Sequence, residues 1–285
     1  MKTKLKVLSL FSGVGMFDYG LERVTRHKHT KQKVFETVAM VEIDEDCQRV
    51  LRNHWPTVSM LDDVKKVFYT ESCFPSFHLY ELDSEGTWCL AYDKKIDVVT
   101  ASWPCQGHSV AGKKKGLNDE RSGLWKETKR ILSEVKPAWF IGENSANLRT
   151  TGLVEVLQDL REIGFSHIEW HILPACAFGA VHRRERIYII AHRDGLRSGI
   201  QTIARKDEKF FRRAKARFVE HNRSRPKSKF YGVGDGPSTW MDRRGDGGYR
   251  YIESERKRRV KQCGNSLYWP IVSFIGECIL EYEKE

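Results

Sequence analysis

The chain has 285 residues, 40% of them hydrophobic, which is enough to bury a substantial core in one elaborated domain or in a larger domain with a smaller partner. No segment approaches the roughly 18 consecutive apolar residues of a membrane span, and the start of the chain lacks the apolar stretch and cleavage site of a signal peptide. Seven cysteines, an odd number with no Cys-x-x-Cys pair, argue against a disulfide framework and a standard zinc site. We therefore expect a protein of the reducing cytoplasm, with no membrane partner and no metal.

The formal net charge of +11 is concentrated in one segment. Residues 193–261 contain 21 Lys and Arg against 9 Asp and Glu, whereas the rest of the chain is close to neutral. This density favours a polyanionic partner, and nucleic acid is the leading candidate. The same segment carries a Gly-rich run, 232–248, with little helical or strand periodicity.

Outside this segment, stretches with strand periodicity alternate with stretches of helical periodicity. The sequence predicts strands at 5–11, 35–42, 96–102 and 137–144, each followed by a helix, at 16–24, 44–55, 122–135 and 151–164. Two further strands are predicted at 167–175 and 186–192, and a C-terminal helix within 263–285 is expected to pack back on the first unit. The alternation is typical of a doubly wound α/β sheet, in which ligands bind at the carboxyl ends of the strands.

Residues 65–95 interrupt this alternation with seven aromatic side chains. Cys73, His78 and Cys89 lie in this stretch, but their spacing is not that of a zinc site. We expect an additional packed excursion ahead of the strand at 96–102.

The first strand ends in the sequence "LFSGVGMF", in which Gly13 and Gly15 precede a helix. Glycines allow a sharp turn and a close approach of the backbone to a ligand, although a tight turn without a ligand is an equally good explanation of two glycines. The third glycine of the dinucleotide fingerprint is absent, because Asp18 stands at its position. Glu42, at the end of the second strand, is placed to bind ribose hydroxyls. Together these features favour an adenosine-containing cofactor without a long phosphate arm.

Six short sequences occur in a fixed order over residues 5–63, 96–192 and 262–282: "SLFSGVGMF", "VEID", "WPCQGHSVAG", "GENS", "RRERIYIIA" and "CGNSLYWP". In this order and approximate spacing the chain resembles the DNA (cytosine-5) methyltransferase family. The resemblance implies a Rossmann-like methyltransferase sheet over 1–192, a smaller basic target-recognition domain over 193–262, and S-adenosylmethionine as cofactor. It also implies methyl transfer to C5 of a cytosine flipped out of double-stranded DNA, by a monomer of bacterial or phage origin with a place in restriction-modification.

The resemblance assigns the chemistry to four residues. Cys105 would add as a thiolate to C6 of cytosine, which converts the ring into an enamine whose C5 can attack a methyl group. Glu143 would protonate or hydrogen-bond N3, and Arg186 would stabilise charge near O2 with help from Arg184. Taken singly, the cysteine could be a buried structural thiol, the carboxylate a turn cap and the arginines part of an exposed edge strand.

The remaining site residues follow from the same motifs. The cofactor would contact Phe11, Gly13, Gly15, Glu42, Ile43, Asp63, Pro104, Leu124, Asn265 and Leu267. A loop over 106–122 would close on the flipped base. DNA would contact Gln106, Ser109 and Arg121 of this loop. The charge of the basic segment, not a motif, adds Arg243, Arg244 and Arg250 as candidate guanine readers or phosphate clamps.

Four positions depart from the family's pattern, one of them Trp103, which stands where phenylalanine or proline is common. Ser9 stands where an acidic residue is usual, Ser145 replaces a valine, and His182 replaces a glutamine. None of them removes a reacting group. Two alternatives stay open: a tRNA cytosine-5 methyltransferase, disfavoured because the recognition region has no Cys-Phe-Thr sequence, and a catalytically inactive DNA-binding relative.

Overall fold

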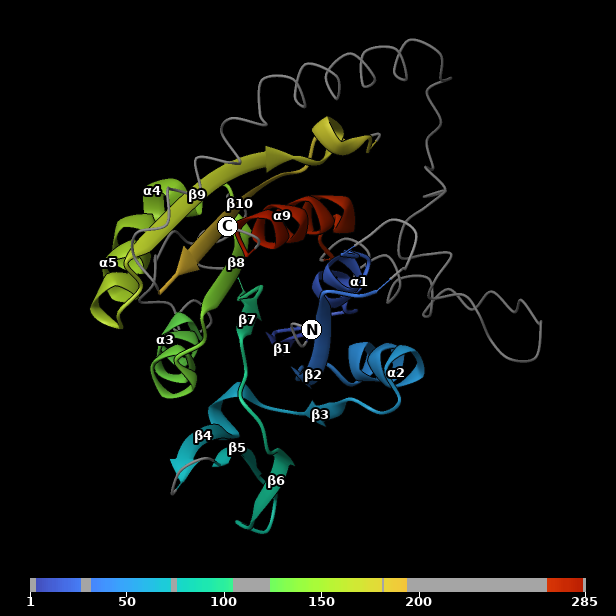
Figure 1. Cartoon of the computed structure of the whole chain (residues 1–285), viewed down its shortest axis with the longest axis vertical. Helices are drawn as coiled ribbons and strands as arrows, with labels where there is room; N and C mark the ends of the chain where they lie inside the picture. Colours follow the sequence, from blue (N-terminus) through green and yellow to red (C-terminus); the bar gives the residue numbers. More distant parts are fainter. Residues whose placement is uncertain are drawn as a thin grey trace, which may run out of the picture.

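The computed structural model describes residues 4–26, 32–72, 76–104, 124–180, 182–193 and 266–283 (Figure 1). The strands are β1 (Leu5–Leu10), β2 (Phe35–Val41), β3 (Ser59–Leu61), β4 (Val67–Ser72), β5 (Ser76–Leu82), β6 (Trp88–Tyr92), β7 (Val98–Ala101), β8 (Trp139–Ser145), β9 (His167–Pro174) and β10 (Glu185–His192). The α-helices are α1 (Met16–Glu22), α2 (Glu45–His54), α3 (Leu124–Val135), α4 (Leu148–Thr151), α5 (Leu153–Glu162) and α9 (Trp269–Tyr282).

Seven strands form the main sheet in the order β3-β2-β1-β7-β8-β10-β9. The five strands from β3 to β8 run parallel, and β10 pairs antiparallel with both β8 and β9. The chain leaves β1 toward β2 and β3 and returns through β7 on the other side, so the strand order reverses between β1 and β7. In sheets of this kind a ligand binds outside the carboxyl ends of the strands at the reversal.

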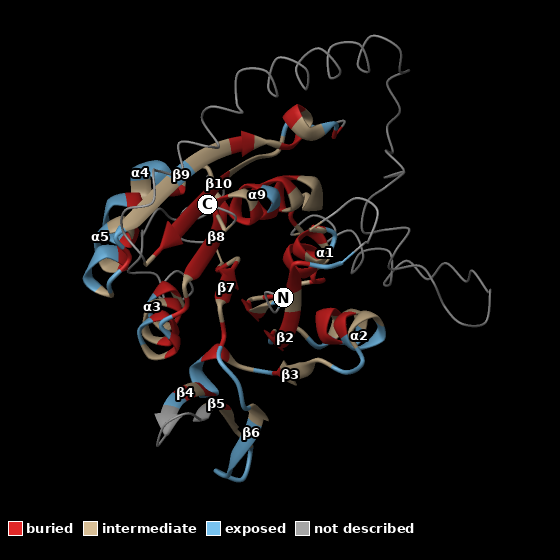
Figure 2. Cartoon of the chain, viewed as in Figure 1, coloured by how far each residue is buried: buried red, intermediate tan, exposed pale blue. Residues whose placement is uncertain are grey.

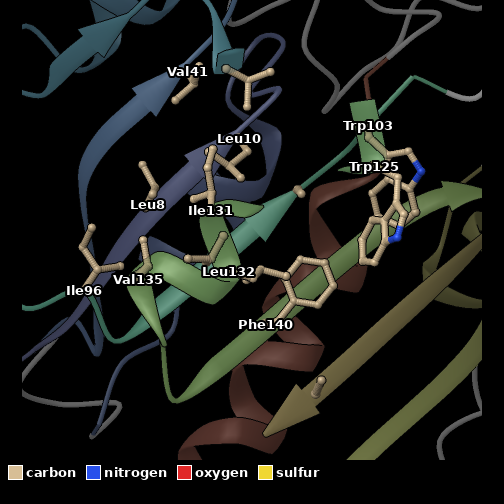
Figure 3. Close-up of a cluster of buried hydrophobic side chains, with 14 of the residues drawn as sticks. Leu8, Leu10, Val41, Ile96, Trp103, Trp125, Ile131, Leu132, Val135 and Phe140 are labelled. Atoms are coloured by element: carbon tan, nitrogen blue, oxygen red, sulfur yellow. The ribbon is translucent and has the colours of Figure 1, made fainter. Parts of the chain in front are cut away.

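Helices cover both faces of the main sheet, and the side chains between the layers are buried (Figure 2). On one face α1 and α9 pack against residues such as Val7 and Ile141. On the other, α3 and α5 pack against Leu8, Val99 and Phe140. Figure 3 shows this second cluster, in which the indole rings of Trp103 and Trp125 lie 4.9 Å apart between centroids. This layering confirms the predicted doubly wound α/β fold.

Each predicted strand and helix of the main sheet is present, with ends shifted by a few residues. Asp44 shows why one of the helices starts where it does: its carboxylate accepts from the backbone N–H groups of Asp46 and Cys47 and caps α2. The helix predicted at 151–164 is α5, preceded by the single turn α4. The sequence reasoning missed β3, which is only three residues long.

The excursion at 65–95 is a separate three-stranded antiparallel sheet, in the order β4-β5-β6. Its inner face is buried in the core through Val67, Tyr69 and Leu79, and the backbone N–H of Tyr69 donates to Glu134 on α3 at 3.0 Å. Its outer face leaves Trp88 and Leu90 exposed. The excursion is therefore packed, as expected, but through one face only.

Helix α9 lies beside α1, although more than 240 residues separate them in the chain (Figure 1). Ser273 donates its hydroxyl to the carbonyl of Gly20 at 2.6 Å, and a Cβ on Gly20 would lie 2.7 Å from Val272. The predicted domain boundary at 192/193 and the basic domain over 193–262 lie almost entirely outside the described residues and stay predictions. None of the helices described here has the length and apolar content that crossing a membrane requires.

Candidate active site

The turn after β1 is built from left-handed backbone conformations. Gly13 and Gly15 have φ angles of 57° and 79°, and Phe11 has φ of 53°. A non-glycine residue in this region costs on the order of 1–3 kcal/mol and persists only where its surroundings enforce it. Such strain is concentrated at functional sites, so the turn at 11–15 is a candidate ligand site on its backbone alone.

The two glycines of this turn serve different purposes. A Cβ on Gly15 would lie 2.5 Å from the indole ring of Trp55, so α1 can start there only because the residue has no side chain. A Cβ on Gly13 would meet nothing within 4 Å. The backbone at Gly13 is therefore open to a ligand, whereas Gly15 is required by packing.

Glu42 follows β2, and its carboxylate binds the backbone of this turn. One carboxylate oxygen accepts from the backbone N–H of Gly13 at 2.7 Å, and the other accepts from the N–H of Asp44 at 2.8 Å. Burial raises the pKa of Glu42, and the two backbone hydrogen bonds oppose that rise. Each oxygen keeps a second lone pair, so the carboxylate can still accept from a hydroxyl of a ligand.

Two further predicted cofactor residues lie at the ends of neighbouring strands. The side chain of Ile43 is 71% exposed beside Glu42, an unusual position for an isoleucine and one that an apolar ligand surface would cover. Asp63 follows β3 and accepts from the backbone N–H of Lys65 at 3.0 Å, which caps a short 3₁₀ turn.

Glu143 is buried at the carboxyl end of β8 and is paired with Arg186 of β10. The guanidinium Nε lies 3.1 Å from a carboxylate oxygen of Glu143. Burial raises the pKa of Glu143, while the charges of Arg186 and Arg184 lower it, and the net direction is upward. The carboxyl group therefore keeps a proton to higher pH than an ordinary glutamate, which suits a proton donor.

The strand pairing explains why these groups meet. Tyr188 lies opposite Glu143 in the β8–β10 register and Arg186 lies two residues earlier, so both point to the face that carries the carboxylate. Burial raises the pKa of Tyr188 well above its ordinary value, so the phenol stays neutral. Arg184 precedes β10 in a left-handed conformation, with φ of 28°.

The end of β7 brings Pro104 to the same edge of the sheet. Trp103 is buried against Gly142 of β8, where a Cβ would lie 3.0 Å from the indole. Asn144 donates its side-chain amide to the carbonyl of Trp103 at 3.2 Å, which ties the end of β8 to the segment before Cys105. Asn144 was missed as a site residue, although a polar residue in a buried strand must find a partner.

The structure thus brings the predicted residues Phe11, Gly13, Gly15, Glu42, Ile43, Pro104, Glu143, Arg184 and Arg186 to the carboxyl edge of one sheet. Leu124 packs against one hydrophobic core and Leu267 belongs to the other. Eight predicted residues lie outside the described residues: Cys105, Gln106, Ser109, Arg121, Arg243, Arg244, Arg250 and Asn265.

A family model described as C-5 cytosine-specific DNA methylase matches residues 5–232 of the chain. The chain belongs to this family. The match includes the glycine turn, the Pro-Cys pair and the strands that carry Glu143 and Arg186, and it confirms the resemblance drawn from the sequence motifs.

Two curated relatives show the extent of the likeness. The Type II methyltransferase M.CviJI of Paramecium bursaria Chlorella virus IL3A is 32% identical over 189 residues, covering 66% of this chain and 43% of that protein. M.Bsp6I of Bacillus sp. (strain RFL6) is 30% identical over 195 residues, covering 67% and 53%. The chain therefore spans about half the length of these relatives. The solved methyltransferase EhMeth of Entamoeba histolytica has the same fold, with a TM-score of 0.50 at 17% identity, over 70% of this chain and 56% of that one.

Proposed function

We propose that this protein transfers a methyl group from S-adenosylmethionine to C5 of a cytosine in DNA. The observation that carries the proposal is the ion pair between the buried Glu143 and the partly exposed Arg186, which lies at the carboxyl edge of the sheet beside the strand that leads into Cys105. The glycine turn of the same edge lies on β1, which pairs with β7. Family membership supports the same reaction class.

The first turn fits the cofactor. Gly13 leaves open space above the backbone, Glu42 offers free lone pairs to ribose hydroxyls, and the exposed Ile43 offers an apolar surface to the adenine ring. Asp63 and Phe11 lie at the ends of the adjoining strands, and Asn265 and Leu267 would close the pocket from the C-terminal side. When bound, S-adenosylmethionine supplies an electrophilic methyl group.

The protein's task is to make C5 of cytosine nucleophilic. The Cys105 thiolate forms a bond to C6 of a flipped base, and the electrons of the C5–C6 double bond become available at C5. Glu143, whose pKa is raised by burial, gives a proton or a hydrogen bond to N3, and Arg186 stabilises the charge near O2. After methylation, loss of the C5 proton expels the thiolate and restores the ring.

Double-stranded DNA is the proposed partner, held by the basic segment 193–262 with Arg243, Arg244 and Arg250 among the contacts. The loop 106–122, with Gln106, Ser109 and Arg121, would close over the flipped base. The names of the two curated relatives refer to Type II methyltransferases, so we place this protein in DNA modification. A bacterial or phage-infected cytoplasm and a monomeric state remain part of the proposal.

The reaction is tested by incubating the protein with S-adenosylmethionine carrying a labelled methyl group and with duplex DNA or tRNA, followed by identification of the modified nucleoside. We expect 5-methylcytosine in the DNA. Label in tRNA alone would establish the RNA reaction instead, and the absence of label in both would favour an inactive relative.

The covalent step is tested with duplex DNA that contains 5-fluorocytosine, in which fluorine replaces the hydrogen that must leave C5. The wild-type protein should form an adduct that survives denaturation. Cys105→Ser should bind S-adenosylmethionine but form no adduct, because a neutral hydroxyl adds poorly to C6. An adduct of equal yield with the serine variant would remove Cys105 from the reaction.

A further inference from the structure

Asp18 of α1 is a fully buried carboxylate for which the methyl-transfer chemistry has no use. Its side chain is 0% exposed, and its two oxygens accept from the hydroxyls of Ser9 on β1 and Thr37 on β2, each at 2.9 Å. It therefore links the first helix to the first two strands, directly behind the turn at 11–15.

The surroundings of Asp18 disfavour the charged form of its side chain. The pKa of Asp18 is raised from 3.8 to about 7: burial is the main cause, the hydroxyls of Ser9 and Thr37 oppose the rise, and the nearby carboxylate of Glu22 adds to it. Glu22 itself is bound by the indole N–H of Trp55 at 3.2 Å and by Lys33 at 2.9 Å. Burying an ionisable acid beside another acid lowers the stability of the fold, so we expect Asp18 to have a role beyond packing.

The hydrogen bonds lead from Asp18 into the glycine turn. Ser9 gives its hydroxyl hydrogen to Asp18, and the hydroxyl of Ser12 donates to Ser9, where the hydroxyl oxygen and the backbone carbonyl both lie 3.0 Å away. Ser12 is held on the backbone as well, by its N–H to the carbonyl of Val41 at 3.0 Å, and its carbonyl accepts from the N–H of Gly15 at 2.9 Å. The chain of contacts thus runs from Asp18 through two serines to the start of α1.

This turn needs such support. It contains Phe11, a non-glycine residue with φ of 53°, and it presents the open backbone of Gly13 to a ligand. Glu42 fixes one side through the N–H of Gly13, and the serine chain fixes the other. A strained turn held from two sides is prearranged for binding, so the ligand does not have to order it.

We infer that Asp18 is a positioning residue for the cofactor-binding turn, acting through the hydroxyls of Ser9 and Ser12. The inference rests on the proposed function for the identity of the ligand, but the arrangement of the turn can be measured without any ligand. Thr37 provides a matched control, because its hydroxyl also binds Asp18 at 2.9 Å in the buried core but does not contact the turn.

The experiment compares Ser9→Ala, Asp18→Asn and Thr37→Val with the wild-type protein. Calorimetry gives the affinity for S-adenosylmethionine, and hydrogen–deuterium exchange of the free protein gives the protection of residues 10–16. Ser9→Ala and Asp18→Asn should weaken cofactor affinity about tenfold, the effect of losing one buried hydrogen bond, and should speed exchange in the turn. Thr37→Val should change affinity by less than about twofold.

Two results would overturn the positioning role: wild-type affinity and exchange in Ser9→Ala, or an equal loss of affinity in Thr37→Val, which would show that any damage to this core acts alike. Ser9→Ala keeps the test decisive if Asp18→Asn does not fold. If exchange in the turn rises as expected while the wild-type protein does not bind S-adenosylmethionine, the positioning role is supported and the proposed function fails.

Discussion

Replacing Asp18 with asparagine should change how the stability of the protein depends on pH. Burial raises the pKa of Asp18 from 3.8 to about 7, so the folded state holds this proton over a range in which the unfolded chain has lost it. The stability that the protonated carboxyl group contributes is fully present below pH 3.8 and is lost as the pH rises through about 7. Roughly three pKa units correspond to about 4 kcal/mol, of which about 2 to 3 kcal/mol falls between pH 5 and pH 8.

The assay is urea denaturation of the wild type and Asp18→Asn at pH 5 and pH 8. Asparagine does not titrate, and the other acids are common to both proteins, so the difference between the two free energies of unfolding isolates Asp18. That difference should shift by about 2 to 3 kcal/mol in favour of the variant at the higher pH. An equal difference at both pH values would refute the reasoning, because Asp18 would then not titrate abnormally.

A control of opposite sign is available on β2. The pKa of Glu36 is lowered, chiefly by its hydrogen bond to Lys6, so its contribution to stability is present above its ordinary pKa of 4.5 and is lost as the pH falls below that value. Glu36→Gln should therefore leave the pH 5 to pH 8 difference nearly unchanged. A shift like that of Asp18→Asn would point to a general effect of removing negative charge.

Three other variants test the site. Gly15→Ala should lower the free energy of unfolding by more than Gly86→Ala, because Gly86 has a similar positive φ but open space around it. The backbone alone should cost about 1 kcal/mol at Gly86, and the clash with the indole 2.5 Å away should add about 1–3 kcal/mol at Gly15. Equal losses in urea denaturation would refute the packing role of Gly15. Glu42→Ala should weaken S-adenosylmethionine binding, measured by calorimetry, by at least tenfold, because the variant loses both the ligand contact and the support of the turn. DNA binding should stay nearly intact. An unchanged cofactor affinity would exclude Glu42 from the site. Replacing Arg243 and Arg244 together by alanine should weaken DNA binding and reduce the salt slope by about two, and a salt series like that of the wild type would place them outside the interface.

The main sheet could be predicted because its central strands are nearly continuous buried runs and its helices have one periodic apolar face. In β8, six of seven residues are buried, and the α3 helix alternates exposed and buried positions such as Lys126 and Ile131. The β4–β6 sheet could not be predicted in the same way, because β6 exposes Trp88 and Leu90, so its aromatic content does not mark a buried face.

The pair that we propose to be catalytic was also accessible to sequence reasoning, since Glu143 and Arg186 each belong to a recognisable motif. Their contact depends on the antiparallel register of β8 and β10, which the sequence does not specify by itself. The partner of Ser9 was harder still. This departure from the family's usual acid is met in the fold by an acid from the next helix, Asp18, and only the packing of α1 on β1 reveals the pair.

The position of α9 has a consequence for the order of synthesis. This helix contributes nine buried residues to the face of the sheet that α1 also covers, and its C-terminal neighbour Glu283 accepts from the indole of Trp139 at 3.0 Å. Until the ribosome has made residues 193–268 and then α9, the part of that face that α9 covers stays exposed. Apolar surface of the nascent sheet therefore stays exposed until α9 is synthesised, and such surface binds chaperones and promotes aggregation. A chain that ends within the basic segment would lack α9 and could not complete this core.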